Sequence, residues 1–198
     1  MKVATLLIAS ALIASPSGAA PKSETAVLAG GCFWGMESVF EHVKGVTSVV
    51  SGYAGGDRKD ASYDKVSSEG TGHAEAVKIT YEPDKISYAQ LLEIYLTVAH
   101  DPTEVDRQGP DVGHSYRSAI FPQNPEQARF AKAFIARLNA AHLYRSPIAT
   151  RIESGGFFPA EAFHQGFARK HPDYPYIVIN DRPKVLSLHK KFPAFYKA

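Results

Sequence analysis

The chain has 198 residues, of which 44% are hydrophobic and 21% are charged, a composition typical of a globular protein with one core of ordinary size. Its formal net charge of +2 and its lack of any basic run argue against a nucleic-acid-binding protein. The single cysteine excludes an internal disulfide, so the fold must depend on core packing.

The first 20 residues have the pattern of a secretory signal peptide. Lys2 precedes an apolar stretch over 3–14, and small residues fill most of 15–20. A positive start, an apolar core and a small-residue end are common to export signals, and the stretch is too short to span a bilayer comfortably. An ordinary buried N-terminal helix is the alternative. We expect cleavage near Ala19 or Ala20, and a mature single domain over 21–198 that is periplasmic or secreted.

Strand and helix patterns then alternate along the chain. Strands are predicted at 25–29, 46–53, 74–81, 116–121 and 148–152. Helical patterns follow Cys32, the capping box of Ser87 and Gln90, and the pair Asn124-Pro125, with a brief helix at 160–167. The segment from Asp173 onward has little periodicity and is expected to be irregular. The alternation predicts an α+β domain of two layers, with helices on one face of a mixed sheet.

Cys32 lies where the first strand gives way to the first helix, in the run 30–35 with sequence GGCFWG. A residue in this place meets unpaired helix N–H groups and the positive end of the macrodipole, which favour the nucleophilic thiolate. Most unpaired cysteines are instead small buried hydrophobes. The glycine pair before Cys32 and the two aromatic residues after it favour the nucleophile.

Glu75 lies in the strand predicted at 74–81. Because side chains alternate between the faces of a strand, Glu75 shares a face with Val77, Ile79 and Tyr81. Apolar neighbours raise the pKa of a carboxyl and make it a proton donor at neutral pH. A glutamate at the strand end that turns out to water is, from the pattern alone, an equal alternative.

Several segments together resemble the A-type peptide methionine sulfoxide reductases. They follow the family's order from about Thr25 to the end of the chain: 31–35 (GCFWG), 52–56 (GYAGG), 71–77 (TGHAEAV), 100–102 (HDP), 107–109 (RQG), 116–118 (YRS) and 174–179 (YPYIVI). The resemblance implies a ferredoxin-like α/β sandwich with long loops and an extended C-terminal segment. It also implies that the domain over 21–198 reduces methionine S-sulfoxide, free or in proteins, to methionine and so repairs oxidative damage.

The resemblance also assigns roles to residues. Cys32 would attack the sulfoxide sulfur while Glu75 protonates the oxygen, leaving methionine and a sulfenic acid on Cys32. Phe33 and Trp34 would hold the substrate methyl group, although both could simply pack in the core.

Three further side chains complete the pocket by resemblance. Tyr63 and Tyr116 would hydrogen-bond the sulfoxide oxygen or a nearby water, and Asp111 would lie near the cysteine. Family members often have glutamine where this chain has Ser115, and we expect a local adjustment there without loss of activity.

Many relatives carry further cysteines toward the C-terminus that resolve the sulfenic acid, and this chain has none. An external thiol must then act: a thioredoxin- or glutaredoxin-like protein, or a small thiol. No bound cofactor or metal is expected, because one cysteine and scattered histidines lack ligand spacing. We expect a monomer that binds neither nucleic acid nor membrane. A thiol hydrolase with a Cys–His pair and an inactive module that binds oxidised methionine are the alternatives.

Overall fold

The computed structural model describes residues 23–198. The signal peptide predicted at 1–20 lies outside the described residues and stays a prediction, as do the boundaries of the mature domain. None of the helices over residues 23–198 combines the length and the apolar character that spanning a membrane requires.

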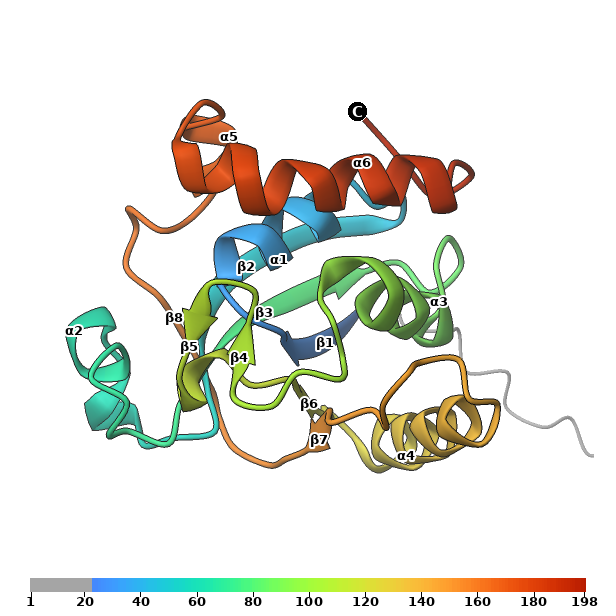
Figure 1. Cartoon of the computed structure of the whole chain (residues 1–198), viewed down its shortest axis with the longest axis horizontal. Coiled ribbons are helices and arrows are strands. Elements are labelled where there is room, and N and C mark those ends of the chain that lie inside the picture. Colours follow the sequence, from blue (N-terminus) through green and yellow to red (C-terminus); the bar gives the residue numbers. More distant parts are fainter. Residues whose placement is uncertain (1–22) are drawn as a thin grey trace, which may run out of the picture.

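A six-stranded sheet forms the centre of the molecule, in the order β7-β6-β1-β3-β2-β8 (Figure 1). Its strands are β1 (Glu24–Ala29), β2 (Val46–Ala54), β3 (Ala74–Tyr81), β6 (Ala119–Phe121), β7 (Arg151–Ile152) and β8 (Phe157–Pro159). Only the pairing of β6 with β7 is parallel, so the sheet is mixed as predicted. A separate pair joins β4 (Arg107–Gln108) to β5 (Asp111–Val112).

Helices connect the central strands in a ferredoxin-like order. The helices are α1 (Phe33–Glu41), α2 (Tyr63–Val66), α3 (Tyr88–Ile94), α4 (Pro125–Ala140), α5 (Phe167–Lys170) and α6 (Arg182–Lys191). π-Helical turns follow α3 at Tyr95–Ala99 and precede α6 at Ile177–Asp181, and 3-10 turns lie at Arg58–Asp60 and His114–Tyr116. With α1 between β1 and β2, and α3 between β3 and β6, the order β6-β1-β3-β2 is that of a split βαβ fold.

The alternation of side chains along β1 divides them between two apolar clusters. Ala26 and Leu28 belong to the large core that also contains the buried faces of α1 and α3. Val27 and Ala29 belong to a smaller cluster on the other face, whose members all lie on strands. The helices therefore pack on one face of the sheet, and the two-layer prediction is confirmed.

Local signals placed the start of two helices correctly. The Ser87 hydroxyl accepts from the Gln90 amide while the Gln90 side chain accepts from the Ser87 amide, which is the predicted capping box. Asn124 accepts from the amide of Gln127 at 2.8 Å, and Pro125 occupies the first turn of α4.

The C-terminal segment is helical, and the prediction of an irregular tail was wrong. The π-helical turn and α6 run together from Ile177 to Lys191. The five-residue π turn interrupts the 3.6-residue period of an α-helix. Leu188 is also the one fully buried side chain of α6, so the sequence shows no apolar stripe by which a helix could be predicted.

Three other predicted boundaries were also wrong. The strand predicted at 116–121 is only Ala119–Phe121, because the chain before it turns to bury Arg117. The strand predicted at 148–152 is reduced to Arg151–Ile152. The helix predicted at 160–167 is a series of turns up to Gly166, whose left-handed φ of 62° precedes α5.

Candidate active site

Cys32 occupies the N-cap position of α1 and is 8% exposed. The two preceding glycines allow the backbone to approach neighbouring side chains closely. Gly31 has a φ of +85°, and a Cβ there would lie 2.6 Å from the side chain of Gln108. A Cβ on Gly30 would lie 2.8 Å from the ring of His100. Close approach on both sides explains why the sulfur follows two glycines.

Glu75 lies beside the cysteine, on the core face of β3. Its side chain is 3% exposed, and its Oε2 accepts a hydrogen bond of 3.0 Å from the amide of Phe33, at the start of α1. Burial, more than the nearby charges of Asp111 and Glu69, raises the pKa of Glu75 to about 8. The raised pKa agrees with the prediction of a carboxyl that is protonated at neutral pH.

The expectation that the helix N-terminus would make Cys32 a ready thiolate was wrong for this state of the protein. Burial first, and then the charges of Glu75, Asp181 and Asp111, raise the pKa of the thiol well above its ordinary value. A hydrogen bond from the Trp34 amide acts in the opposite direction but is outweighed. The resting cysteine therefore holds its proton.

The two predicted tyrosines and the aspartate converge on the same place. Burial is the main cause of the raised pKa of Tyr63 and of Tyr116, and the charges of Glu75, Asp111 and Cys32 add to it in both cases. Both hydroxyls therefore stay protonated and can donate hydrogen bonds. Glu75, Asp111 and Cys32 are thus close enough to act on each tyrosine, although the residues come from separate elements.

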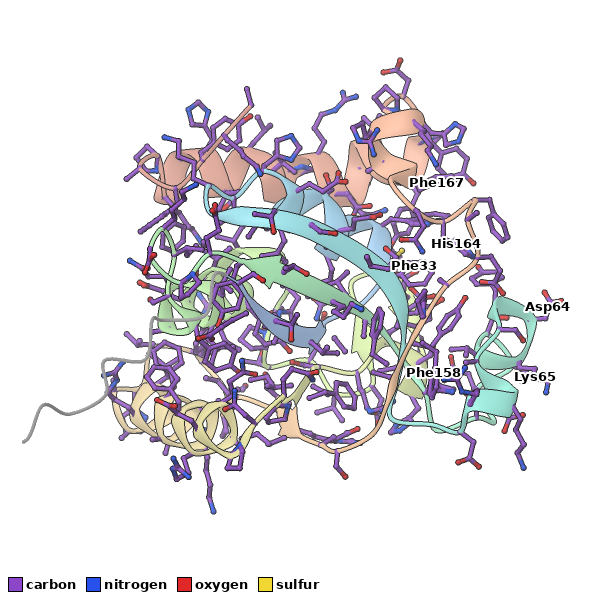
Figure 2. All side chains as sticks on the ribbon, turned by 180° about the vertical axis from the view of Figure 1, so that it is seen from behind. Phe33, Asp64, Lys65, Phe158, His164 and Phe167 are labelled. Atoms are coloured by element: carbon purple, nitrogen blue, oxygen red, sulfur yellow. The ribbon has the colours of Figure 1, made fainter. Side chains whose placement is uncertain are left out.

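An aromatic wall borders the cysteine. The Trp34 ring stacks on Phe167 with centroids 3.8 Å apart, and its Nε1 donates to Nδ1 of His164 at 3.2 Å. The ring of Phe33, 1% exposed, lies 4.8 Å from that of His164. Figure 2 shows Phe33 and His164 close together, with Phe167 above them at the start of α5. Phe33 is therefore both a core residue and part of the wall.

Several side chains that no sequence prediction named complete this site. Glu161 accepts from the Tyr63 amide at 2.9 Å and from the Tyr53 hydroxyl at 2.8 Å, which fixes the start of α2. The Tyr176 hydroxyl donates to Asp111. Tyr176 lies within the resembling segment 174–179, whereas no local pattern marks Glu161.

A buried ion pair from the C-terminal segment lies against the first turn of α1. Asp181 is fully buried, its Oδ1 is 3.2 Å from Nζ of Lys184, and its Oδ2 has no hydrogen-bond partner. A Cβ on Gly35 would lie 2.8 Å from Cγ of the buried Asp181, so only glycine fits there. The same aspartate raises the pKa of Cys32. No sequence signal pointed to this pair.

The geometry does not form a Cys–His pair among residues 23–198. His73 bonds the backbone of Gly56 and Asp57, and His100 bonds Ser118 and the Tyr95 carbonyl. His164 is engaged with Trp34. No hydrogen bond in the described part joins an imidazole to Cys32, which argues against the hydrolase. Nor do the described residues bring three His, Cys, Asp or Glu side chains together as a metal site.

Fold and site together place one buried cysteine beside a buried carboxyl of raised pKa, an arrangement typical of thiol enzymes. The family model described as peptide methionine sulfoxide reductase matches residues 24–195. A peptide methionine sulfoxide reductase MsrA 2 of Mesorhizobium japonicum is 55% identical, covering 90% of this chain and 92% of its own. A second, from Synechocystis, is 45% identical over 89% of this chain and 83% of its own.

Solved structures agree with the sequence comparisons. Methionine sulfoxide reductase A of Corynebacterium diphtheriae superposes with a TM-score of 0.67 at 34% identity, covering 78% of this chain and 77% of that one. Reduced Mxr1 of Saccharomyces cerevisiae gives 0.70 at 29% identity, covering 77% and 88%. The chain belongs to the peptide methionine sulfoxide reductase family. It is an oxidoreductase that reduces methionine sulfoxide to methionine and takes part in protein repair.

Proposed function

We propose that Cys32 and Glu75 carry out the reduction as a pair in which at least one of the two groups always holds a proton. Glu75 protonates the sulfoxide oxygen, and Cys32 attacks the sulfur as its own thiol proton moves to Glu75. The S–O bond of the substrate breaks, the hydroxyl is transferred to Cys32, and methionine leaves. Two negative charges never coexist in this buried place, where they would be most costly. The closeness of the two groups supports this proposal, since the charge of Glu75 raises the pKa of Cys32.

The surrounding residues orient the substrate in this proposal. Tyr63 and Tyr116 donate to the sulfoxide oxygen, since both hydroxyls keep their protons. Trp34 and Phe33 receive the methyl group against the aromatic wall. Asp111, which accepts from Tyr176, orders the far side of the pocket. A site that fixes the oxygen and the methyl on different sides accepts one epimer at sulfur, and the family resemblance indicates the S epimer.

The single cysteine leads us to propose an external reductant. After one turnover Cys32 holds a sulfenic acid that no second thiol of this chain can capture. An incoming thiol displaces water from the sulfenic acid to give a mixed disulfide, and a second thiol releases Cys32. A thioredoxin- or glutaredoxin-like protein, or a small thiol, fits this chemistry.

A stoichiometric assay tests the cycle. Reduced protein without added thiol should release one methionine per subunit from the S epimer and then stop, leaving a one-oxygen adduct on Cys32 by mass spectrometry. Added dithiothreitol should restore turnover, and the R epimer should not react. Release of two methionines per subunit without thiol would contradict the single-cysteine cycle.

The pattern of residues 1–20 also supports export to the periplasm or the medium, and we expect the mature protein to act there as a monomer. Fractionation of expressing cells with sequencing of the mature N-terminus tests the export, because retention of Met1 in a cytoplasmic protein would refute it. Sedimentation of the mature protein tests the monomer.

A further inference from the structure

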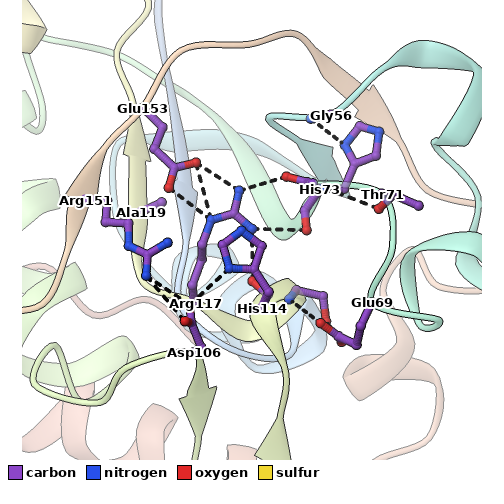
Figure 3. A network of polar contacts seen from close by, with 12 residues as sticks. Gly56, Glu69, Thr71, His73, Asp106, His114, Arg117, Ala119, Arg151 and Glu153 are labelled. Atoms are coloured by element: carbon purple, nitrogen blue, oxygen red, sulfur yellow. Dashed lines mark hydrogen bonds and ion pairs between the residues drawn. The ribbon is translucent and has the colours of Figure 1, made fainter.

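A buried arginine joins the strand that carries Glu75 to the turn that carries Tyr116. The side chain of Arg117 is 3% exposed and directly follows that turn. Its Nη1 donates to the carbonyl oxygens of His73 at 3.1 Å and His114 at 2.9 Å (Figure 3). His73 lies two residues before Glu75, and His114 lies two residues before Tyr116. One guanidinium therefore sets the separation of the two segments.

The other donors of Arg117 are used on Gly72 and Glu153. Nη2 donates to the Gly72 carbonyl at 3.0 Å, while Nε and Nη2 contact the two carboxylate oxygens of Glu153 at 3.0 and 2.9 Å. The backbone of Glu153 is itself held, since its amide donates to the Ile120 carbonyl at 3.0 Å. Paired N–H···O bonds of this kind fix orientation as well as distance. The guanidinium is thus held rigidly.

The charge of this arginine matters because the neighbouring acid must stay neutral. Besides the Phe33 amide, which hydrogen-bonds the carboxyl, the groups that act most strongly on Glu75, or that its charge affects, are acids: Cys32, Tyr53, Tyr63, Glu69, Asp111 and Tyr116. An uncompensated cation at the start of β3 would favour the carboxylate form of Glu75. The carboxylate of Glu153 cancels that positive charge at a contact of 2.9 Å.

We propose that Arg117 and Glu153 are positioning residues for the proton-donating step. Arg117 holds Glu75 and Tyr116 at a set separation, and Glu153 neutralises Arg117 so that the acid keeps its proton. The guanidinium of Arg117 supplies the rigid geometry. The carboxylate of Glu153 prevents its positive charge from lowering the pKa of Glu75. This inference rests on the proposed role of Glu75.

Glu153→Gln removes the negative charge of this side chain, while glutamine keeps the same size and one oxygen acceptor. The alkaline limb of the kcat–pH profile should move to lower pH by about 0.5 unit or more, because Arg117 is no longer neutralised. At lower pH, where Glu75 is protonated in both proteins, kcat should fall less than in Arg117→Lys, because glutamine still accepts one of the two N–H bonds.

The matched control is Arg151→Gln. Arg151 pairs with Asp106 at 3.2 Å in the same region, but both side chains are about 40% exposed and neither bonds the backbone before Glu75 (Figure 3). This variant should leave the alkaline limb in place.

Arg117→Lys tests the positioning role because lysine keeps the charge and loses the fork. We expect kcat to fall by roughly 10- to 100-fold with a much smaller change in KM. The double variant Arg117→Met/Glu153→Gln carries neither charge. Its alkaline limb should return toward that of the unmodified enzyme while its kcat stays low.

An alkaline limb of the kcat–pH profile that stays in place in Glu153→Gln would overturn the proposal. An unchanged kcat in Arg117→Lys would do the same. If Arg117→Lys does not fold, the limb of Glu153→Gln decides alone. Glu75→Gln in the same buffers identifies the titrating group. A limb that persists in Glu75→Gln refutes the role of Glu75 itself. A limb that Glu75→Gln abolishes and Glu153→Gln does not move refutes only the roles of Arg117 and Glu153.

Discussion

Two regions of the molecule meet at Cys32 and contribute in different ways. Residues 24–81 supply the sulfur and the acid, both on elements held by continuous backbone hydrogen bonds. Residues 157–191 complete the aromatic wall, with His164 against Phe33 and Phe167 against Trp34, and they supply a buried ion pair. The reacting groups are therefore placed by the sheet, whereas their surroundings depend on how the C-terminal segment packs against α1.

This comparison predicts that substitutions in the first region abolish or strongly slow the reaction. Substitutions in the second region should instead change the pKa of Cys32 or the stability of the fold. The largest expected effect is that of Cys32→Ser, which removes the only sulfur able to attack. Reductase activity with dithiothreitol should be lost entirely, while substrate binding measured by calorimetry should survive, since the wall remains. Substantial residual turnover would mean that the chemistry does not reside in the first region.

Glu75→Gln should have the second largest effect. Because glutamine cannot deliver a proton, kcat should fall by roughly 10²–10⁴-fold. The alkaline limb of the unmodified enzyme, expected near the Glu75 pKa of about 8, should disappear in the variant. Near-native turnover with an unchanged profile would show that another group protonates the oxygen.

The two regions also differ in how far the sequence could predict them. Cys32 and Glu75 have local signals, a glycine pair before a helix and a carboxyl on the apolar face of a strand, and the structure confirms both positions. Tyr63, Asp111 and Tyr116 came from the family resemblance alone, and the structure brings them around the cysteine.

What the sequence could not predict depends on contacts between distant segments. The raised pKa of Cys32 comes from burial and from carboxyls on β3, β5 and the C-terminal segment, which only the folded chain brings together. Asp181 stands at the end of a π-helical turn and is followed by a proline in the first turn of α6, so the usual helical period is interrupted there. The contacts of Ser115 could not be predicted for the same reason. Its hydroxyl and its amide donate to Glu69, a partner 46 residues away.

Asp181→Asn tests whether the second region controls the pKa of Cys32, and it should have a moderate effect. Removing a charge that raises the Cys32 pKa should lower that pKa and increase the thiolate fraction at neutral pH. Alkylation of Cys32 by iodoacetamide should become roughly three- to tenfold faster, which corresponds to a pKa about 0.5 to 1 unit lower. Asp173→Asn is the control, because Asp173 lies on the same segment with its side chain 95% exposed. An equal or slower rate in Asp181→Asn would show that the pair does not act on the sulfur.

The smallest expected effect concerns the joint between the two regions. Glu37 of α1 is 2% exposed, and its Oε2 accepts from the amide of Gly166 at 2.9 Å, directly before α5. Burial raises the pKa of Glu37 from 4.5 to about 7 in the folded protein. Between these values the unfolded chain releases the proton first, so the contribution of Glu37 to stability is complete below pH 4.5 and is lost as pH rises to about 7.

Glu37→Gln removes this titration and keeps an acceptor for the Gly166 amide. The difference in unfolding free energy between the unmodified protein and the variant should therefore change with pH only within that window, by at most about 3 kcal/mol. Glu75 titrates with the same sign but is present in both proteins, so it cancels from the difference. Urea unfolding at a series of pH values measures it, with the exposed Glu93→Gln as control. A difference that does not depend on pH would mean that Glu37 is ionised in the fold, and that the joint between α1 and the C-terminal segment is held by charge.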